Sequence, residues 1–202
     1  MMSVIVVMST VLALVPFYLL GTFPTGYLVA KLHGVDITAV GSGNVGATNV
    51  SRVVGKRAGL LTLLVDVFKG AFGIALASGL SHKPDFICLS GIAVVAGHCF
   101  SVPPYLKGGK GVATALGVIA VLSAKSAIVA LVVFLSVFTT KRIVSLASMC
   151  AALAVPAYAI VANLPDYVAA SEACIAVLLL YRHRENIQRL IEGREPKFTT
   201  KK

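Results

Sequence analysis

The chain has 202 residues, of which 57% are hydrophobic and 13% are charged, with a formal net charge of +10. Soluble domains usually carry about 25% charged residues, so this composition excludes an ordinary soluble domain and indicates a protein of the lipid bilayer. The positive charge does not indicate nucleic acid as a partner, because no RNA- or DNA-binding motif surrounds the basic residues and cytoplasmic loops of membrane proteins retain Lys and Arg.

The first apolar segment, residues 4–30, contains no charged residue. A membrane span needs about 20 apolar residues, and this segment exceeds that length. It lacks the basic start and the small-residue cleavage site of a signal peptide, so we expect one retained span. Further apolar segments follow at about 58–81, 86–98, 109–123, 126–139, 143–163 and 167–181.

The sequence SAKS at 123–126 interrupts the apolar run from Val112 to Phe138. The run could form one long helix with Lys125 buried, or two short helices with a turn at the lysine. With the turn, fifteen of the eighteen basic residues fall on one side of the membrane, in 31–57, 99–111, 140–142 and 182–202. The positive-inside rule then favours seven helices, with the N-terminus outside and the C-terminus in the cytoplasm.

The two short helices would have about 15 residues each, or about 22 Å at the helical rise. Because a bilayer core is about 30 Å thick, the loop that begins the first of them must lie below the membrane surface. Non-helical backbone is tolerated there only where it is buried in protein or lines a wet cavity. The segment lengths therefore predict a recessed polar pocket that opens to the cytoplasm.

Asp66 and Lys69 lie within the second apolar segment, three residues apart and hence on one helix face. Charged groups inside a membrane usually mark a functional site. A pair at this spacing can also simply neutralise itself. The sequence leaves both interpretations open.

The first polar motif is GSGNVGATN at 41–49. Its glycines fit the G-x-G-x-x-G pattern of dinucleotide-binding proteins, with Asp66 twenty residues further on. The context rejects that function, because no strand precedes the motif and Asp66 lies in a membrane helix. What remains is a loop rich in hydrogen-bond donors, followed by Arg52, that could bind an anion or be a polar turn.

The second polar motif is KGGKG at 107–111, nine residues after His98. A glycine-rich turn before a helix exposes backbone N–H groups, and the lysines add positive charge, a combination that suits phosphate. It is not the P-loop of an ATPase, because Gly111 stands where that motif has Ser or Thr after its lysine. His98 could be structural or could take part in the site.

The third polar motif is YRHRENIQRLIEGRE at 181–195. On one helix, Arg182, Asn186 and Arg189 fall near one face with His183 beside them. The alternative is a basic helix that contacts anionic lipid. A shorter stretch, KRIVSLAS at 141–148, adds Ser145 on the same side of the membrane. Together the four stretches suit a polyanionic substrate, and no spacing of His, Cys, Asp or Glu suits a metal.

In combination and order, GSGNVGATN, GH…KGGKGVAT and RHRENIQRL…GRE resemble the three motifs of the bacterial acyl-phosphate-dependent glycerol-3-phosphate acyltransferases. The resemblance implies a single membrane-embedded all-α domain over residues 1–202, a polytopic protein of seven transmembrane helices in the bacterial cytoplasmic (inner) membrane. Its active site would face the cytoplasm. It would transfer a fatty acyl group from acyl phosphate to the 1-hydroxyl of glycerol 3-phosphate, giving lysophosphatidic acid and phosphate. The expected partners are these two substrates, the bilayer and a peripheral enzyme that produces acyl phosphate; no cofactor and no metal are expected.

The resemblance also assigns roles to residues of this sequence. The expected catalytic residues are Ser42, His98, Ser145, His183 and Asn186. The expected phosphate-binding residues are Asn44, Thr48, Asn49, Arg52, Lys107, Gly108, Gly109, Lys110, Gly111, Arg182 and Arg189. Two positions depart from the family: Ser101 stands where proline is usual, and Leu106 where phenylalanine is usual.

The general base is not decided by the sequence. Acyltransferases with an H-x-x-x-x-D motif use the aspartate to orient a basic histidine, but none of the four histidines here has an aspartate at that spacing. Either a histidine or a phosphate oxygen of the acyl donor could accept the proton. A transporter of a phosphorylated metabolite is the rival function, although it would need access from both faces of the membrane.

Overall fold

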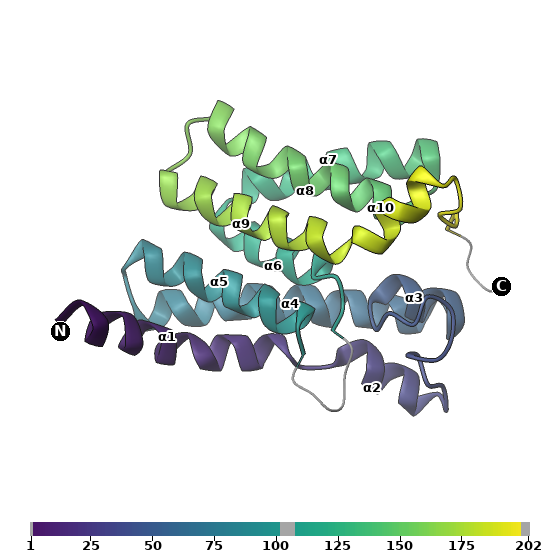
Figure 1. Ribbon diagram of the computed structural model, residues 1–202, viewed down its shortest axis with the longest axis horizontal. Helices are drawn as coiled ribbons and strands as arrows, with labels where there is room; N and C mark the ends of the chain where they lie inside the picture. The colour runs from purple at the N-terminus through teal and green to yellow at the C-terminus, as the bar shows by residue number, and fades with distance from the viewer. Residues whose placement is uncertain (1, 102–107, 199–202) are drawn as a thin grey trace.

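The computed structural model describes residues 2–101 and 108–198, with residues 2–7 by their backbone alone (Figure 1). Within these ranges the chain forms ten α-helices and no strand, which confirms the all-α prediction. The longer helices are α1 (Met2–Gly21), α4 (Lys56–Leu80), α5 (Pro84–Cys99), α6 (Val112–Leu122), α7 (Ala124–Lys141), α8 (Val144–Val161) and α9 (Asp166–Arg182). The short helices are α2 (Thr25–Leu32), α3 (Ala47–Val53) and α10 (Arg184–Ile191).

The longer helices lie side by side in a bundle, and the short helices α2, α3 and α10 gather at the end opposite the N-terminus (Figure 1). Four segments of the described chain are long and apolar enough to cross a membrane: Met8–Leu32, Lys56–Leu80, Ala124–Lys141 and Val144–Val161. Large apolar side chains such as Phe68, Leu135 and Leu153 are exposed on their outer faces. Such outward-facing apolar surface fits lipid and not water, so the chain is a multi-pass membrane protein.

The first apolar segment is long and apolar enough to cross a membrane, over Met8–Leu32, as its length predicted, but it forms two helices instead of one. α1 ends at Gly21 and α2 begins at Thr25. Pro24 lacks an N–H group and disfavours helical backbone in the residue before it, which explains the interruption. Pro16 and Pro156 remain inside helices. The break frees the backbone carbonyl of Phe23, which accepts a hydrogen bond from Lys69.

The predicted turn in SAKS is confirmed, since α6 ends at Leu122 and α7 begins at Ala124. Ser123 caps α7 by accepting a hydrogen bond from the backbone N–H of Ser126 at 3.2 Å. The expected lengths were only half right. α6 has 11 residues and is short, whereas α7 has 18 residues and is long enough to span a membrane.

Two glycines let α6 pack directly on the backbone of α4. A methyl group at Gly70 would collide with the carbonyl of Thr114, and one at Gly117 would collide with that of Val67. The first turn of α6 therefore packs beside the middle of α4, because Gly70 lies fourteen residues after Lys56, about 21 Å along the helix axis at the helical rise. Gly109 and Gly111, just before α6, are buried, and the predicted position of this loop below the membrane surface stays a prediction.

The third motif forms two helices instead of one. α9 ends at Arg182 and α10 begins at Arg184, with His183 at the junction. The backbone N–H of His183 still donates to Leu179, and its carbonyl still accepts from Ile187. The chain therefore bends while both backbone groups of His183 stay hydrogen-bonded, and the side chains on either side of His183 contact different neighbours.

Candidate functional site

The first motif is a loop held together by the side chain of Asn49. Asn49 is 2% exposed; its amide nitrogen donates to the carbonyls of Val40 (3.1 Å) and Asn44 (3.0 Å). Its amide oxygen accepts from the backbone N–H of Ser42 at 2.9 Å. Because backbone groups of the loop bind both the nitrogen and the oxygen of this amide, Asn49 shapes the loop. Few hydrogen-bonding positions of its side chain remain for a phosphate. Gly41 supports the same turn with a positive φ of 63°.

The other donors of the first motif have no side-chain hydrogen bond or ion pair to any residue that the structure describes. Ser42 is exposed, and Thr48 and Arg52 are half-buried. The structure therefore does not join these side chains to the other motifs by direct contact. Asn44 is used locally, because its side-chain oxygen accepts from the backbone N–H of Gly46 at 2.8 Å.

Arg182 fixes the glycine loop from the end of α9. Its guanidinium donates to the carbonyls of Gly108 (2.8 Å) and Gly109 (3.0 Å). The backbone N–H of Gly109 donates to the carbonyl of His98 at 2.9 Å. Gly111 then starts α6 with a φ of 80°, which glycine adopts without strain. Arg182 therefore orients the loop, and its predicted binding of phosphate stays a prediction. Lys107 lies outside the described residues.

Lys110 joins the second motif to the third through a hydrogen bond to the side-chain oxygen of Asn186. Burial lowers the pKa of the Lys110 ammonium to about 8, against the opposing effect of Glu195. An ammonium that loses its proton this readily is poorly solvated, so an incoming anion would stabilise it. The sequence predicted both residues at the site, and the structure brings them into contact.

Glu195 is the centre of this polar cluster, and the site residues predicted from the sequence did not include it. Its carboxylate accepts hydrogen bonds from Asn186 (2.5 Å), Ser145 (2.6 Å) and Arg189 (2.7 Å). Burial alone raises the pKa of Glu195, but the hydrogen bonds outweigh it and the pKa lies below its ordinary value. The signal was present in the third motif, which ends in GRE, but nothing in the sequence linked this acid to Ser145.

His183 is buried against the backbone at the bend between α9 and α10. It is 2% exposed, and its Nδ1 lies 2.7 Å from the carbonyl of Leu179. A carbonyl can only accept, so Nδ1 carries the proton and Nε2 carries a lone pair. Burial lowers the pKa of His183 to about 4. The residue is therefore neutral at pH 7 and is a weak base.

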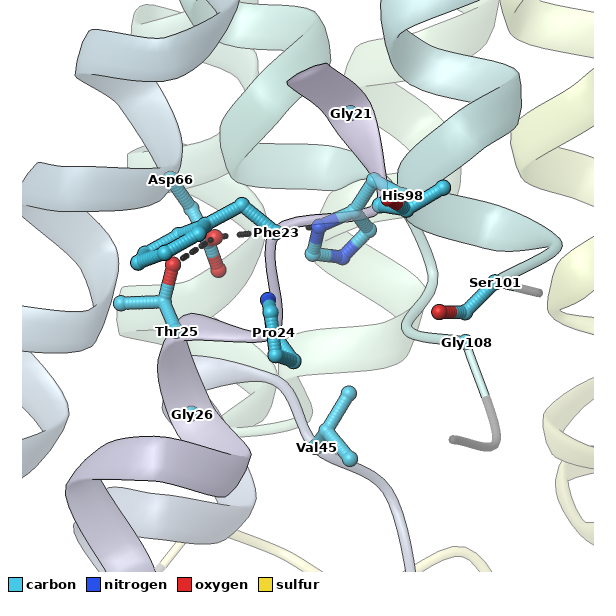
Figure 2. A pocket seen from close by; sticks show the side chains of 11 residues that line it. Gly21, Phe23, Pro24, Thr25, Gly26, Val45, Asp66, His98, Ser101 and Gly108 are labelled. Carbon is cyan, nitrogen blue, oxygen red and sulfur yellow. Dashed lines mark hydrogen bonds and ion pairs between the residues drawn. The ribbon is translucent and has the colours of Figure 1, made fainter. Parts of the chain in front are cut away.

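His98 lies beside the charged pair of α4. Its Nδ1 is 2.8 Å from the Nζ of Lys69, which in turn is 2.8 Å from a carboxylate oxygen of Asp66. Thr25 donates to the same oxygen of Asp66 at 3.0 Å, and Figure 2 shows Thr25, Asp66 and His98 facing one another. A pocket opens between them and the glycine loop. Its lining includes Thr22, Thr25, Val45, Asp66, His98 and Gly108.

The pocket thus brings together parts of the first and second motifs and of the α1–α2 break. Val45 comes from the first motif, and Gly108 and His98 come from the second. The Lys110–Asn186–Glu195 cluster starts from the same short loop, through Lys110. Among the residues that the structure describes, no group of three or more His, Cys, Asp or Glu side chains could hold a metal ion.

The chain is similar to known proteins over almost its whole length. The family model described as "Glycerol-3-phosphate acyltransferase" matches residues 11–193. The chain is 46% identical over 183 residues to the "Glycerol-3-phosphate acyltransferase" of Aquifex aeolicus, which covers 90% of this chain and 95% of that one. It is 42% identical over 190 residues to that of Geotalea daltonii, with coverages of 94% and 98%.

Two solved structures share the fold. Both are crystal structures of "PlsY (YgiH), an integral membrane glycerol 3-phosphate acyltransferase", and each is 42% identical to this chain and covers 95% of it and 96% of the solved chain. The glycerol 3-phosphate form has a TM-score of 0.87 and the lysophosphatidic acid form a TM-score of 0.85. The arrangement of the described helices is therefore that of an integral membrane acyltransferase.

Proposed function

The chain belongs to the glycerol-3-phosphate acyltransferase family, and from this membership we propose that it transfers a fatty acyl group from acyl phosphate to the 1-hydroxyl of glycerol 3-phosphate. A bond forms between the hydroxyl oxygen and the acyl carbon, and the bond from that carbon to the phosphate oxygen breaks. The products are lysophosphatidic acid and phosphate. The solved relatives in glycerol 3-phosphate and lysophosphatidic acid forms support this substrate and this product.

The observation that carries the proposal is the contact of Lys110 with Asn186 at the glycine loop. A half-buried ammonium in a glycine-rich loop, together with an apolar bundle, suits a substrate that is anionic at one end and fatty at the other. Glu195 supports this reading, because its carboxylate accepts from three side chains at once. We place the phosphate of glycerol 3-phosphate at the glycine loop.

The expected chemistry makes modest demands on the protein. Acyl phosphate is an activated mixed anhydride, so the hydroxyl must be aligned, the oxyanion stabilised and one proton removed. A general base works best with a pKa near the operating pH. His183, with a pKa of about 4, does not meet that condition. We therefore favour transfer of the hydroxyl proton to the departing phosphate.

The same proposal includes the orientation of the protein. The N-terminus would lie outside and the basic C-terminus in the cytoplasm of the bacterial inner membrane, with seven helices crossing it. The short helices α2, α3 and α10, which gather at one end of the bundle, would then form the cytoplasmic face (Figure 1). A peripheral enzyme that makes acyl phosphate would deliver the donor to this face.

Purified protein incubated with labelled glycerol 3-phosphate tests the proposal. With acyl phosphate we expect labelled lysophosphatidic acid, and with acyl-CoA or acylated carrier protein we expect none. Product from acyl-CoA alone would overturn the proposed donor while leaving the family membership intact.

A further inference from the structure

The charged pair on α4 has a partner that belongs to the candidate site. Asp66 and Lys69 are 2% and 4% exposed, and neither lies in one of the three motifs. A buried ion pair is stable only where further hydrogen bonds satisfy both ions. Here Thr25 donates a hydrogen bond to the carboxylate of Asp66. The ammonium of Lys69 lies at hydrogen-bond distance from the carbonyl of Phe23 and from Nδ1 of His98. The pair therefore does more than neutralise itself.

The hydrogen bonds of Lys69 determine where His98 carries its proton. A lysine ammonium has three N–H donors and no acceptor. Its Nζ has three neighbours at bonding distance: the carboxylate of Asp66 (2.8 Å), the Nδ1 of His98 (2.8 Å) and the carbonyl of Phe23 (3.1 Å). Each donor thus has one acceptor, and Nδ1 of His98 must present a lone pair.

Asp66 acts on His98 through Lys69 and not directly. Its carboxylate oxygen is 3.7 Å from Nδ1, which is beyond hydrogen-bond distance. The carboxylate pairs with the ammonium of Lys69 and holds it in place, with Thr25 fixing the carboxylate in turn. With Nδ1 occupied as an acceptor, the proton of the neutral imidazole is on Nε2.

The Nε2 side of the ring faces the glycine loop. A methyl group at Gly109 would collide with Nε2, so the ring lies directly against the loop backbone. Figure 2 shows the ring between Asp66 on one side and Gly108 and Ser101 on the other. Within the described residues Nε2 has no hydrogen-bond partner. Its N–H group is thus available at the loop where we place a phosphate.

We infer that the Asp66–Lys69 pair holds His98 in its Nε2–H tautomer, so that His98 donates a hydrogen bond to a substrate phosphate oxygen and is not the general base. Asp66 and Lys69 are then positioning residues. The inference rests on the proposed function and refines it. The hydroxyl proton goes to the departing phosphate, as proposed above, and His98 keeps its proton throughout the reaction.

The tautomer can be read without substrate. We propose nitrogen NMR of protein labelled at its histidine imidazoles in detergent, with His98→Gln and His183→Gln variants to assign the signals. The two residues should show opposite tautomers, with the proton on Nε2 in His98 and on Nδ1 in His183. A proton on Nδ1 of His98 in the wild-type protein would overturn the inference.

A lysine variant tests the cause. In Lys69→Met the restriction on Nδ1 is removed, and the His98 signal should move toward the Nδ1–H or doubly protonated form. Lys125→Met is the matched control, because Lys125 is an exposed lysine at the far end of the bundle, and it should leave the spectrum unchanged. An unchanged His98 tautomer in folded Lys69→Met would overturn the role of the pair. The wild-type spectrum decides the tautomer even if this variant does not fold.

Rescue by a neutral donor separates the two roles of His98. The amide N–H of glutamine can replace Nε2–H, but glutamine cannot act as a base. We expect His98→Ala to lose roughly 10- to 150-fold in kcat/KM, the value of one hydrogen bond to a charged group, and His98→Gln to recover most of it. Equal losses in both variants would overturn the donor role. The NMR measurement does not depend on catalysis, so the two proposals can fail separately. Wild-type protein that shows the expected tautomers but is inactive with acyl phosphate would refute the proposed reaction and not the inferred tautomer.

Discussion

At the scale of one residue, Lys110 shows how one partly buried charge can serve the recognition of an anionic substrate. Its ammonium contacts Asn186, and burial holds its pKa at about 8. The membrane helices do not depend on this charge, because Lys110 lies in the loop before α6. Changes at this position should therefore act on substrate binding more than on folding.

The first prediction concerns the charge of Lys110 itself. Lys110→Met keeps most of the side-chain volume and removes the ammonium, and we expect the KM for glycerol 3-phosphate to rise roughly 10- to 150-fold. Lys110→Arg should restore little, because a planar guanidinium does not fit a site made for a compact charge. The measurements are the KM for each substrate and the thermal stability in detergent. An unchanged KM, or a loss of stability that matches the loss of activity, would contradict a binding role.

The second prediction follows from the pKa of Lys110. Below a pH of about 8 the ammonium is protonated and attracts phosphate, and above it the charge is lost. Because kcat/KM reports the ionisation of the free enzyme, its value for glycerol 3-phosphate should fall as the pH rises through about 8. The same profile in Lys110→Met should lack this alkaline limb. If kcat/KM fell in the same way at alkaline pH in both proteins, the fall would come from the ionisation of a group other than Lys110.

At the scale of elements, two contacts decide how the helices present the site. The carboxylate of Glu195 holds the chain after α10 against the first turn of α8 through Ser145. The backbone N–H of Phe198 also donates to the carbonyl of Arg142 at 2.7 Å, next to α8. The second contact is that of α6 with α4 through Gly70 and Gly117, which positions the loop before α6.

The third prediction tests the contact of Glu195. Glu195→Ala leaves Ser145 and Asn186 without their acceptor, and each unsatisfied buried group costs about 1–3 kcal/mol. We expect a melting temperature several degrees lower, with Glu195→Gln intermediate because it keeps one carbonyl oxygen. Glu192→Ala is the control, since Glu192 is exposed and its pair with Arg194 is a surface ion pair. Equal stability of the Glu195 and Glu192 variants would show that the contact is not structural.

The fourth prediction tests the close approach of α4 and α6. Gly70→Ala places a methyl group against the carbonyl of Thr114, and such overpacking typically costs about 1–3 kcal/mol. Because α6 carries the glycine loop, activity should fall together with stability. Gly79→Ala is a matched control on the same helix, where a methyl group meets nothing within 4 Å. Full activity and stability in Gly70→Ala would show that neither depends on the close backbone contact between α4 and α6.

At the scale of the whole molecule, the distribution of charge predicts the orientation in the membrane by the positive-inside rule. α7 carries one lysine near each end, Lys125 and Lys141, and both are exposed. If this helix spans the bilayer, the two amines lie on opposite sides. A single helix therefore provides both the test residue and its control.

The fifth prediction uses that pair. A membrane-impermeant amine reagent added to intact cells should label Lys125 and not Lys141. After permeabilisation both should react. Labelling of Lys141 alone in intact cells would reverse the proposed orientation, and labelling of both would contradict a span.

The amino-acid sequence by itself determined the class of protein, the apolar segments, the turn near Lys125 and the motif content of the site. Hydrophobicity over about 20 residues decides membrane insertion, and the distribution of basic residues along the chain predicts the turn, because only with the turn do fifteen of the eighteen fall on one side of the membrane. The helix break at Pro24 has a local cause. It was not predicted, because proline is common in membrane helices and does not by itself indicate a break.

Only the tertiary structure decided which polar groups meet. The link from Asp66 through Lys69 to His98 joins α4 to the end of α5, and Glu195 meets Ser145 across fifty positions of the chain. Such contacts depend on how closely the helices approach, which glycines such as Gly70 and Gly117 set through backbone contact. The spacing of residues along the sequence does not predict the distances between these polar side chains. Each side chain belongs to a helix whose rotation and depth are fixed by packing with neighbouring helices.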